Sequence, residues 1–224
     1  MTTTTPLDAP PVDEGTEARS ELYGLLADAL DFPSRDFHLR VEAGVLRDEV
    51  EALLSSLPYE VAAAEALAGL AAAEDYISFQ GEYIRLFDVG TVRPPCPLYD
   101  GEWGGARKSA MEDVLRFYRF FGLKMDGATH ELPDHVTIEF EFMKVLAFLE
   151  GTAVARGADP VAIFRAERDF LERHPGRWWP LLCRKLPGLE PTPFYASIAA
   201  LVNAVIRADL AYVKSAIANA PAAG

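Results

Sequence analysis

The chain has 224 residues, of which half are apolar and 25% are charged, a balance typical of a folded domain and not of a disordered chain. Its formal net charge is -13, which excludes a generic nucleic-acid binder, because such proteins need a basic surface to contact phosphates. The charge is uneven: residues 1–75 contain 16 acidic and four basic side chains, whereas the rest of the chain is nearly neutral.

The N-terminal third predicts a short tail followed by helices. Residues 1–16 are rich in Thr, Pro and Asp and have no apolar period, so they predict a disordered tail. Leucines and alanines at helical spacing predict a helix over residues 22–30, which Pro33 stops. A second apolar stripe predicts a helix over residues 46–57. An alanine-rich run that continues into aromatic positions predicts one long third helix over residues 61–87.

The middle of the chain predicts a long irregular loop and then a capped helix. Residues 88–108 contain three prolines and four glycines, and loops of this length inside compact domains tend to be functional. Ser109 with Glu112 three places on is a capping box, which predicts the start of a helix that Gly122 ends.

Prolines mark the starts of the remaining helices. Pro133 is expected at the first position of a helix that runs to about Ala155. Pro160 and Pro193, each preceded by a capping residue, open two more helices, and a short helix over residues 178–186 lies between these two. No segment alternates like a strand, so the predicted fold class is all-α, a single-domain helical bundle with roughly seven to ten helices.

The predicted organisation is one domain with two short tails. The all-helical domain covers residues 17–215, between the disordered tail at 1–16 and a flexible C-terminal tail at 216–224. The longest stretch without a charge, residues 191–206, is 16 residues long and contains two prolines, so no membrane span is expected. The N-terminus lacks the basic start and apolar core of a secretory signal, so we expect a cytoplasmic protein.

A search for catalytic chemistry finds only weak signals. Phosphate-binding loops, dinucleotide motifs, zinc motifs and nucleophile elbows are missing from the sequence, so no catalytic residue, metal or cofactor is predicted. His135 and Glu139 have the i, i+4 spacing of two metal ligands, but a first-turn histidine beside a carboxylate is the favoured interpretation. Cys96 is expected to be a small, partly buried cysteine and not a reactive thiol. At least one of Trp178 and Trp179 is expected to be a core residue.

Five segments, in order, resemble the TorD/DmsD/NarJ family of chaperones for molybdenum enzymes. They are LYGLLA at 22–27 with Phe32-Pro33, EYIRLF at 82–87, PPCPLY at 94–99, LPDHVTIEFEFM at 132–143, and His174 with Trp178. The resemblance spans about residues 20 to 213, and the order and spacing of the segments are more specific than any one of them. Where many relatives have Glu-Ser after the loop tyrosine, this chain has Asp100-Gly101, a departure from the family pattern.

The resemblance implies an all-helical cytoplasmic chaperone that acts by binding and not by catalysis. Such proteins hold an apo catalytic subunit of the dimethyl sulfoxide reductase type, and often its twin-arginine leader, until the molybdenum cofactor is inserted. The positions that match the family, and that are therefore expected to bind the client or its leader, are Tyr83, Leu86, Phe87, Pro97, Tyr99, Pro133, Asp134, His135, Glu139 and Phe142.

A leader with two arginines and an apolar stretch needs a groove with apolar walls and nearby acidic groups. Tyr83, Phe87 and Tyr99 are expected to form the walls. Asp134 and Glu139, or the acidic N-terminal third, are expected to face the arginines. The partners that the resemblance implies are an apo molybdoenzyme subunit, with or without its leader, bound by a monomer or dimer. No nucleic acid is expected as a partner.

Two other functions remain open at this stage. One is a metal-dependent enzyme that uses His135 and Glu139, and the other is a structural helical subunit of a redox complex. The three hypotheses differ in whether the protein contains a metal and in whether it stays bound to the mature enzyme.

Overall fold

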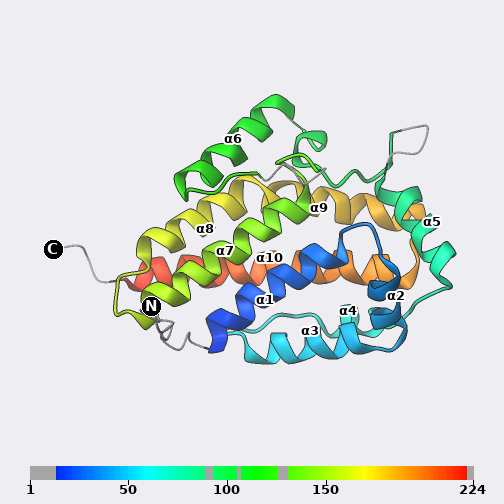
Figure 1. Cartoon of the computed structure of the whole chain (residues 1–224), viewed down its shortest axis with the longest axis horizontal. Coiled ribbons are helices and arrows are strands. Elements are labelled where there is room, and N and C mark those ends of the chain that lie inside the picture. The colour runs from blue at the N-terminus through cyan, green and yellow to red at the C-terminus, as the bar shows by residue number, and fades with distance from the viewer. Residues whose placement is uncertain (1–13, 89–92, 105–106, 126–130, 221–224) are drawn as a thin grey trace, which may run out of the picture.

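The computed structural model describes residues 14–88, 93–104, 107–125 and 131–220. Within these ranges the chain forms ten α-helices and two short 3-10 helices but no strand, which confirms the predicted all-α fold (Figure 1). In chain order the elements are α1 (Glu14–Ala29), α2 (Arg35–Glu42), α3 (Val45–Ser56), α4 (Ala64–Gly69), α5 (Tyr76–Phe87), η1 (Asp100–Glu102), α6 (Arg107–Phe120), α7 (Val136–Ala155), α8 (Val161–Arg173), α9 (Pro175–Lys185), η2 (Leu186–Leu189) and α10 (Pro193–Asn219).

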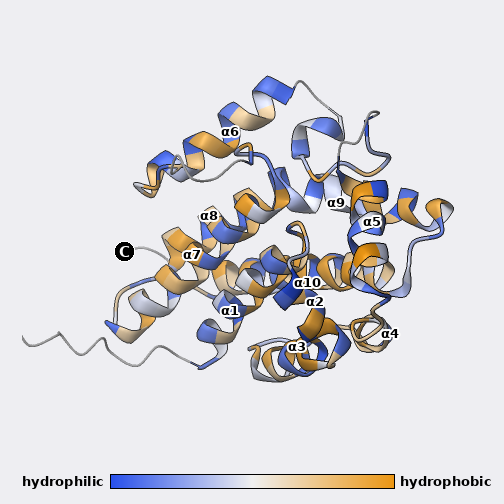
Figure 2. Cartoon of the chain, turned by 45° about the vertical axis from the view of Figure 1, so that its right-hand side comes forward, coloured by the Kyte–Doolittle hydropathy of each residue, from blue (hydrophilic) through white to orange (hydrophobic). Residues whose placement is uncertain are grey.

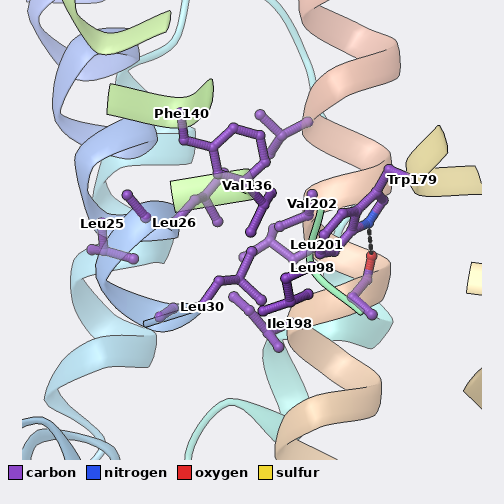
Figure 3. Close-up of a cluster of buried hydrophobic side chains, with 14 of the residues drawn as sticks. Leu25, Leu26, Leu30, Leu98, Val136, Phe140, Trp179, Ile198, Leu201 and Val202 are labelled. Atoms are coloured by element: carbon purple, nitrogen blue, oxygen red, sulfur yellow. Dashed lines mark hydrogen bonds between the residues drawn. The ribbon is translucent and has the colours of Figure 1, made fainter. Parts of the chain in front are cut away.

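The core lies between α1, α7 and α10, and α9 closes one end. Leu26, Phe140 and Ile198 come from the first three helices and are completely buried. Figure 3 shows these side chains pointing toward one another, with Trp179 of α9 beside them. The Trp179 indole donates a hydrogen bond to the Ala199 carbonyl at 3.0 Å, so its one polar group is satisfied inside the core. The outer helices are amphipathic: Figure 2 shows hydrophilic and hydrophobic residues together on α3.

The predicted third helix is two helices, so this prediction was wrong. The chain leaves helical geometry after Gly69 and resumes at Tyr76, where the Asp75 carboxylate accepts hydrogen bonds from the backbone N–H groups of Ile77 and Ser78. An aspartate cap of this kind starts a new helix whatever the apolar pattern before it. The same chemistry explains α2, which the apolar pattern did not reveal and which Ser34 caps.

Two predicted helix starts are displaced. α6 begins at Arg107, so Ser109 lies inside the first turn and does not cap it. α7 begins at Val136 with His135 as its N-cap, and Pro133 therefore precedes the helix and is not its first residue. The predicted end of this helix at Ala155 is confirmed.

The helical domain extends further than residues 17–215. α1 begins at Glu14, and α10 continues to Asn219. The rest of the two predicted tails, residues 1–13 and 221–224, lies outside the described residues.

α10 is the longest helix and occupies a central position. Among the described residues it is the one helix long and apolar enough to cross a membrane, with a mean hydropathy of 1.5 over its most apolar 18 residues. Half of that window is buried inside the protein, and Ile198, Leu201 and Val205 are fully buried. A helix in the core of a bundle is also long and apolar, so the central position of α10 explains its apolar composition.

A single buried arginine connects four helices. Arg19 of α1 is fully buried, and its guanidinium donates to Asp209 of α10 at 2.9 Å and to Glu167 of α8 at 3.1 Å, and also to Glu150 of α7. The hydroxyl of Tyr23 donates to Asp209 at 2.6 Å. We call Arg19, Glu150, Glu167 and Asp209 the arginine network; it fixes the first helix against the last.

Candidate functional site

The proline-rich loop and the Pro-Asp-His segment lie side by side. The Leu98 carbonyl accepts a hydrogen bond from the Val136 N–H at 2.9 Å, and the Asp100 N–H donates to the Asp134 carbonyl at 2.9 Å. These bonds form an antiparallel bridge between Tyr99 and His135. Two motifs more than thirty residues apart in the sequence therefore form one structural unit at the start of α7.

The other end of the loop is attached to α5. The Cys96 N–H donates to the Leu86 carbonyl at 2.9 Å, and the Trp103 indole donates to the Pro97 carbonyl at 2.8 Å. Cys96 itself is fully buried, and burial raises the pKa of its thiol, which agrees with the predicted unreactive cysteine. The loop thus joins the end of α5 to the beginning of α7.

Aromatic rings gather where these elements meet. Phe32 contacts Tyr83 edge to face at 5.6 Å between ring centroids, and 45% of Phe32 is exposed. The half-buried ring of Tyr99 contacts the His135 ring at 4.8 Å. Tyr83 lies below the surface and donates its hydroxyl to the Leu30 carbonyl at 3.0 Å. We call Phe32, Tyr83, Tyr99 and His135 the aromatic patch.

Three carboxylates shift the pKa values of residues in the aromatic patch. Burial raises the pKa of Tyr83, and the negative charges of Asp31, Glu131 and Asp88 raise it further. The same three carboxylates oppose the effect of burial on His135, which lowers the pKa of that ring. Asp31 and Asp88 are exposed and Glu131 is half-buried, so solvent-accessible carboxylates lie around the patch.

His135 has a defined structural role within the patch. Its Nδ1 accepts a hydrogen bond from the Thr137 N–H at 3.4 Å and lies 2.7 Å from the Thr137 hydroxyl, so the ring caps α7. The lowered pKa of His135, caused by burial, favours the neutral ring that this acceptor role requires. Its Nε2 lies 3.9 Å from Glu131.

A second group of polar side chains lies inside the protein, next to the same loop. It consists of Asp100, Asp134, Glu139 and His174, all at most 2% exposed, and we call it the buried polar cluster. His174 Nδ1 is 2.8 Å from Asp100, and the Trp178 indole donates to Glu139 at 3.1 Å. Burial, and then the charge of Asp100, raises the pKa of Glu139 well above its usual range.

The structure brings only some of the expected site residues together. Tyr99 contacts His135 and is close enough to Tyr83 to affect its pKa, and Tyr99 is the half-buried member of the three. Asp134 and Glu139 are fully buried, so the expectation that they face the arginines of a leader is not met. The acidic groups around the patch are Asp31, Asp88 and Glu131, which the sequence pattern did not single out.

The other expected residues lie outside the aromatic patch, and most of them are buried. Leu86 and Phe87 are at most 4% exposed and belong to the core, so Phe87 is not a wall of an open groove. Pro97 is buried. The Pro133 carbonyl accepts the Tyr118 hydroxyl at 2.9 Å, and Phe142 packs on Phe170 at 4.7 Å between centroids.

In the structure His135 and Glu139 contact different groups, so they do not form the metal-binding pair that the sequence left open. His135 contacts Tyr99 and Thr137, whereas Glu139 contacts Trp178 and lies with Asp100 and His174. Asp100 and His174 occur in the sequence segments quoted above, but only the folded chain shows that they meet. At least one of Trp178 and Trp179 is expected in the core, and both are fully buried there.

Comparisons with known proteins identify the family of this chain. Residues 54–184 match the family described as nitrate reductase delta subunit. The perchlorate reductase assembly chaperone protein of Dechloromonas aromatica (strain RCB) is 32% identical over 198 residues, which cover 86% of this chain and 88% of that protein. The dimethyl sulfide dehydrogenase assembly chaperone protein of Rhodovulum sulfidophilum is 30% identical and covers 87% of this chain and 81% of that protein.

A solved structure shares the fold. It comes from Archaeoglobus fulgidus and is described as that of a redox enzyme maturation protein. It is 21% identical to this chain, covers 84% of it and 93% of that chain, and gives a TM-score of 0.52.

The fold, the loop-to-α7 unit and the named relatives define the class of protein: a helical assembly chaperone that is not an enzyme. The chain belongs to the nitrate reductase delta subunit family. The resemblance to the TorD/DmsD/NarJ chaperones is thereby confirmed, and the chaperone TorD of Vibrio parahaemolyticus is itself 24% identical over 140 residues.

Proposed function

We propose that this protein is the assembly chaperone of a molybdenum-dependent oxidoreductase of the dimethyl sulfoxide reductase type. It holds the apo catalytic subunit in the cytoplasm until the cofactor is inserted, and it then leaves. The names of the relatives support an oxidoreductase client, since they assemble perchlorate reductase and dimethyl sulfide dehydrogenase. The molybdenum cofactor of the client is inferred from the resemblance in the loop and the Pro-Asp-His segment.

We further propose that the aromatic patch binds a leader peptide with two adjacent arginines. The observation that carries this proposal is the combination of exposed Phe32 and half-buried Tyr99 with Asp31, Asp88 and Glu131 around them. Aromatic rings offer apolar surface to the hydrophobic part of a leader, and arginine guanidinium groups stack on rings and pair with carboxylates. Asp31, Asp88 and Glu131 lie close enough to act on both Tyr83 and His135, so the acidic groups and the rings are near one another, as such a peptide requires.

Peptide binding to the full chain tests the patch directly. A synthetic peptide with two adjacent arginines followed by an apolar stretch is titrated into the protein, and the dissociation constant is measured by calorimetry. The double substitution Asp31→Asn with Glu131→Gln is expected to weaken binding by about tenfold or more, since each charge-assisted hydrogen bond contributes about 1.5–3 kcal/mol. A matched control is Glu65→Gln, which removes an exposed carboxylate on α4.

Two results contradict this assignment. One is unchanged binding by the double variant. The other is equal loss in the double variant and in Glu65→Gln, which would attribute the effect to net charge and not to the patch. Replacing both arginines of the peptide with glutamine is expected to abolish the difference between the wild type and the double variant.

The whole function is tested with a catalytic subunit of the dimethyl sulfoxide reductase type from the same organism. Co-purification of the full chain with the cofactor-free subunit, with and without its leader, is expected to give a complex that the cofactor-loaded subunit does not form. A complex with neither form would overturn the proposal.

The family description favours one further candidate, a structural subunit, because it names a subunit of nitrate reductase. Such a subunit stays with the mature enzyme. Size analysis of the purified holoenzyme distinguishes the two, since a chaperone is expected to be missing from it.

A further inference from the structure

The buried polar cluster contains three side chains of the types that bind metals. Asp100, Glu139 and His174 each offer one ligand atom, and these atoms lie within 4.8 Å of one another. Two ligands of a common zinc ion, each about 2.1 Å from it, are at most about 4.2 Å apart. Movements of less than about one ångström therefore bring all three atoms into coordination distance.

Several polar atoms of this cluster lack a partner. Among the described residues, five buried side-chain nitrogen or oxygen atoms have no hydrogen-bond partner. Three of them are in the cluster: Asp134 Oδ1, Glu139 Oε1 and His174 Nε2. His174 Nε2 has the Asp113 carboxylate 3.3 Å away, so the atoms left without a partner are the two carboxylate oxygens. An unpaired buried polar atom is costly, and two in one cluster indicate that the protein alone does not complete this site.

The carboxylates are already oriented by donors on one side. Arg177 pairs with Asp100 through Oδ1, and the Trp178 indole donates to Glu139 Oε2. The second oxygen of Glu139, Oε1, has no hydrogen-bond partner, and the second oxygen of Asp100, Oδ2, lies 2.8 Å from Nδ1 of His174, another of the three candidate ligand residues. Metal-binding carboxylates commonly have an outer hydrogen bond to one oxygen, which fixes the direction of the other oxygen.

Solvent can reach the edge of this cluster. A surface cavity of about 360 Å³ is lined by Asp100 and His174 together with Asp113 and Arg177. Asp113 Oδ2 lies 3.3 Å from His174 Nε2 at the wall of that cavity. An ion has a short path from this cavity to the buried side chains.

We propose that Asp100, Glu139 and His174 bind one zinc-like divalent cation. One imidazole and two carboxylates are ligands that suit zinc, and the three protein ligands leave a position for water. The ion connects three elements: Asp100 directly follows Tyr99 of the loop, Glu139 lies in α7 one turn after His135, and His174 is the N-cap of α9. Its role is structural: it holds the elements that carry the aromatic patch in one arrangement.

Metal titration of the full chain tests the proposal. The protein is treated with a chelator, the chelator is removed, and Zn²⁺ or Mg²⁺ is added while heat and thermal stability are recorded. We expect one Zn²⁺ per chain and a higher Tm with zinc, with no comparable effect of Mg²⁺, which prefers oxygen ligands. Absence of zinc binding overturns the proposal.

Matched variants locate the ion. Glu139→Gln keeps an oxygen for the Trp178 indole and removes the charge, and His174→Gln removes the imidazole. Each is expected to weaken zinc binding by at least about tenfold. The controls are His38→Gln, a buried histidine on α2, and Glu150→Gln, a buried glutamate of the arginine network. Zinc affinity that is equal in the cluster variants and the wild type contradicts the site.

A spectroscopic measurement covers the case in which a cluster variant does not fold. In the wild type, paramagnetic Co²⁺ in this site is expected to broaden the ring signals of His174 in the NMR spectrum and to leave those of His38 unchanged. Broadening of His38 without His174, or of neither ring, overturns the assignment.

Discussion

Arg19 is a single charge in the centre of the bundle with three carboxylates around it. One guanidinium cannot balance three buried negative charges, so protons make up part of the difference. Burial raises the pKa of Glu167 to about 8, with the nearby Arg19 opposing this effect. Burial also raises the pKa of Glu150. The structure therefore keeps at least one carboxyl of the arginine network protonated near neutral pH.

The protonated carboxyl of the arginine network predicts that the free energy of unfolding falls as the pH rises. An unfolded glutamate has a pKa of about 4.3, so between about 4.3 and about 8 the folded protein holds a proton that the unfolded chain releases. The free energy of unfolding is expected to decrease through this window and to level off above it. Urea denaturation at a series of pH values checks the slope.

The variant Glu167→Gln imitates the protonated side chain and is expected to remove most of that slope. Glu172→Gln, at an exposed position of the same helix, serves as the control and should keep it. A slope that is the same in all three proteins would assign the pH dependence to other groups.

Two substitutions at His135 distinguish its structural role as a helix cap from a role in leader binding. His135→Ala removes the cap of α7 and is expected to cost about 1 kcal/mol of stability. Asparagine is a good N-cap, so His135→Asn should keep the thermal stability but lose the ring that Tyr99 contacts. If the ring contributes to leader binding, His135→Asn binds the arginine peptide more weakly at unchanged Tm. Wild-type affinity in His135→Asn would leave His135 with its capping role alone.

At the scale of elements, the contact between α4 and α10 depends on a glycine. A Cβ atom at Gly69 would lie 2.1 Å from the Ser197 hydroxyl oxygen and 2.7 Å from the Pro193 carbonyl. The carbonyl belongs to the backbone at the start of α10 and cannot move aside easily. Gly69→Ala is therefore expected to lower the free energy of unfolding by about 1–3 kcal/mol.

Gly81 is the matched control, since it lies within α5 and a Cβ there meets no atom within 4 Å. Gly81→Ala is expected to raise stability by about 0.4–1 kcal/mol, because alanine restricts the unfolded chain. Denaturation midpoints of the two variants decide the matter. The same sign of change in both would contradict the close approach of α4 to α10.

The sequence predicted most helices because apolar periodicity is a local signal. It missed breaks and starts that depend on a single side chain, such as the Asp75 cap within an apolar run and the His135 cap after Pro133. The two sites were only partly predictable. Family motifs indicated Tyr99 and His135, but the approach of Asp100 to His174 and of Asp31 to the aromatic patch depends on how distant segments pack, which no local pattern contains.

At the scale of the whole molecule, most of the net charge of -13 comes from residues 1–75, which contain 16 acidic and four basic side chains. Every described acidic residue in the range 14–75 is exposed except Glu49, which is half-buried. This agrees with a solvated surface for most of them. Asp31 is the one member of the acidic third that the structure places beside the aromatic patch.

A long-range charge effect on client binding is therefore expected. Affinity for the arginine peptide should fall as salt increases from about 0.01 M to about 0.15 M, because the screening length shortens from about 30 Å to about 8 Å. The double variant Asp31→Asn with Glu131→Gln should show a shallower salt dependence. Calorimetric titrations at several salt concentrations measure both slopes, and a salt-independent affinity of the wild type would place recognition in apolar contacts.

The arginine network also has a consequence for biosynthesis. Arg19 and Asp209 are 190 positions apart, so the ribosome makes one long before the other. At about 5–20 residues per second, roughly 10 to 40 s separate the two. Glu150 and Glu167 are made within that interval, but Arg19 still lacks Asp209, and a buried charge whose network is incomplete is unfavourable. The native bundle thus forms only after α10 emerges, and a nascent chain stalled before Asp209 cannot yet serve a client.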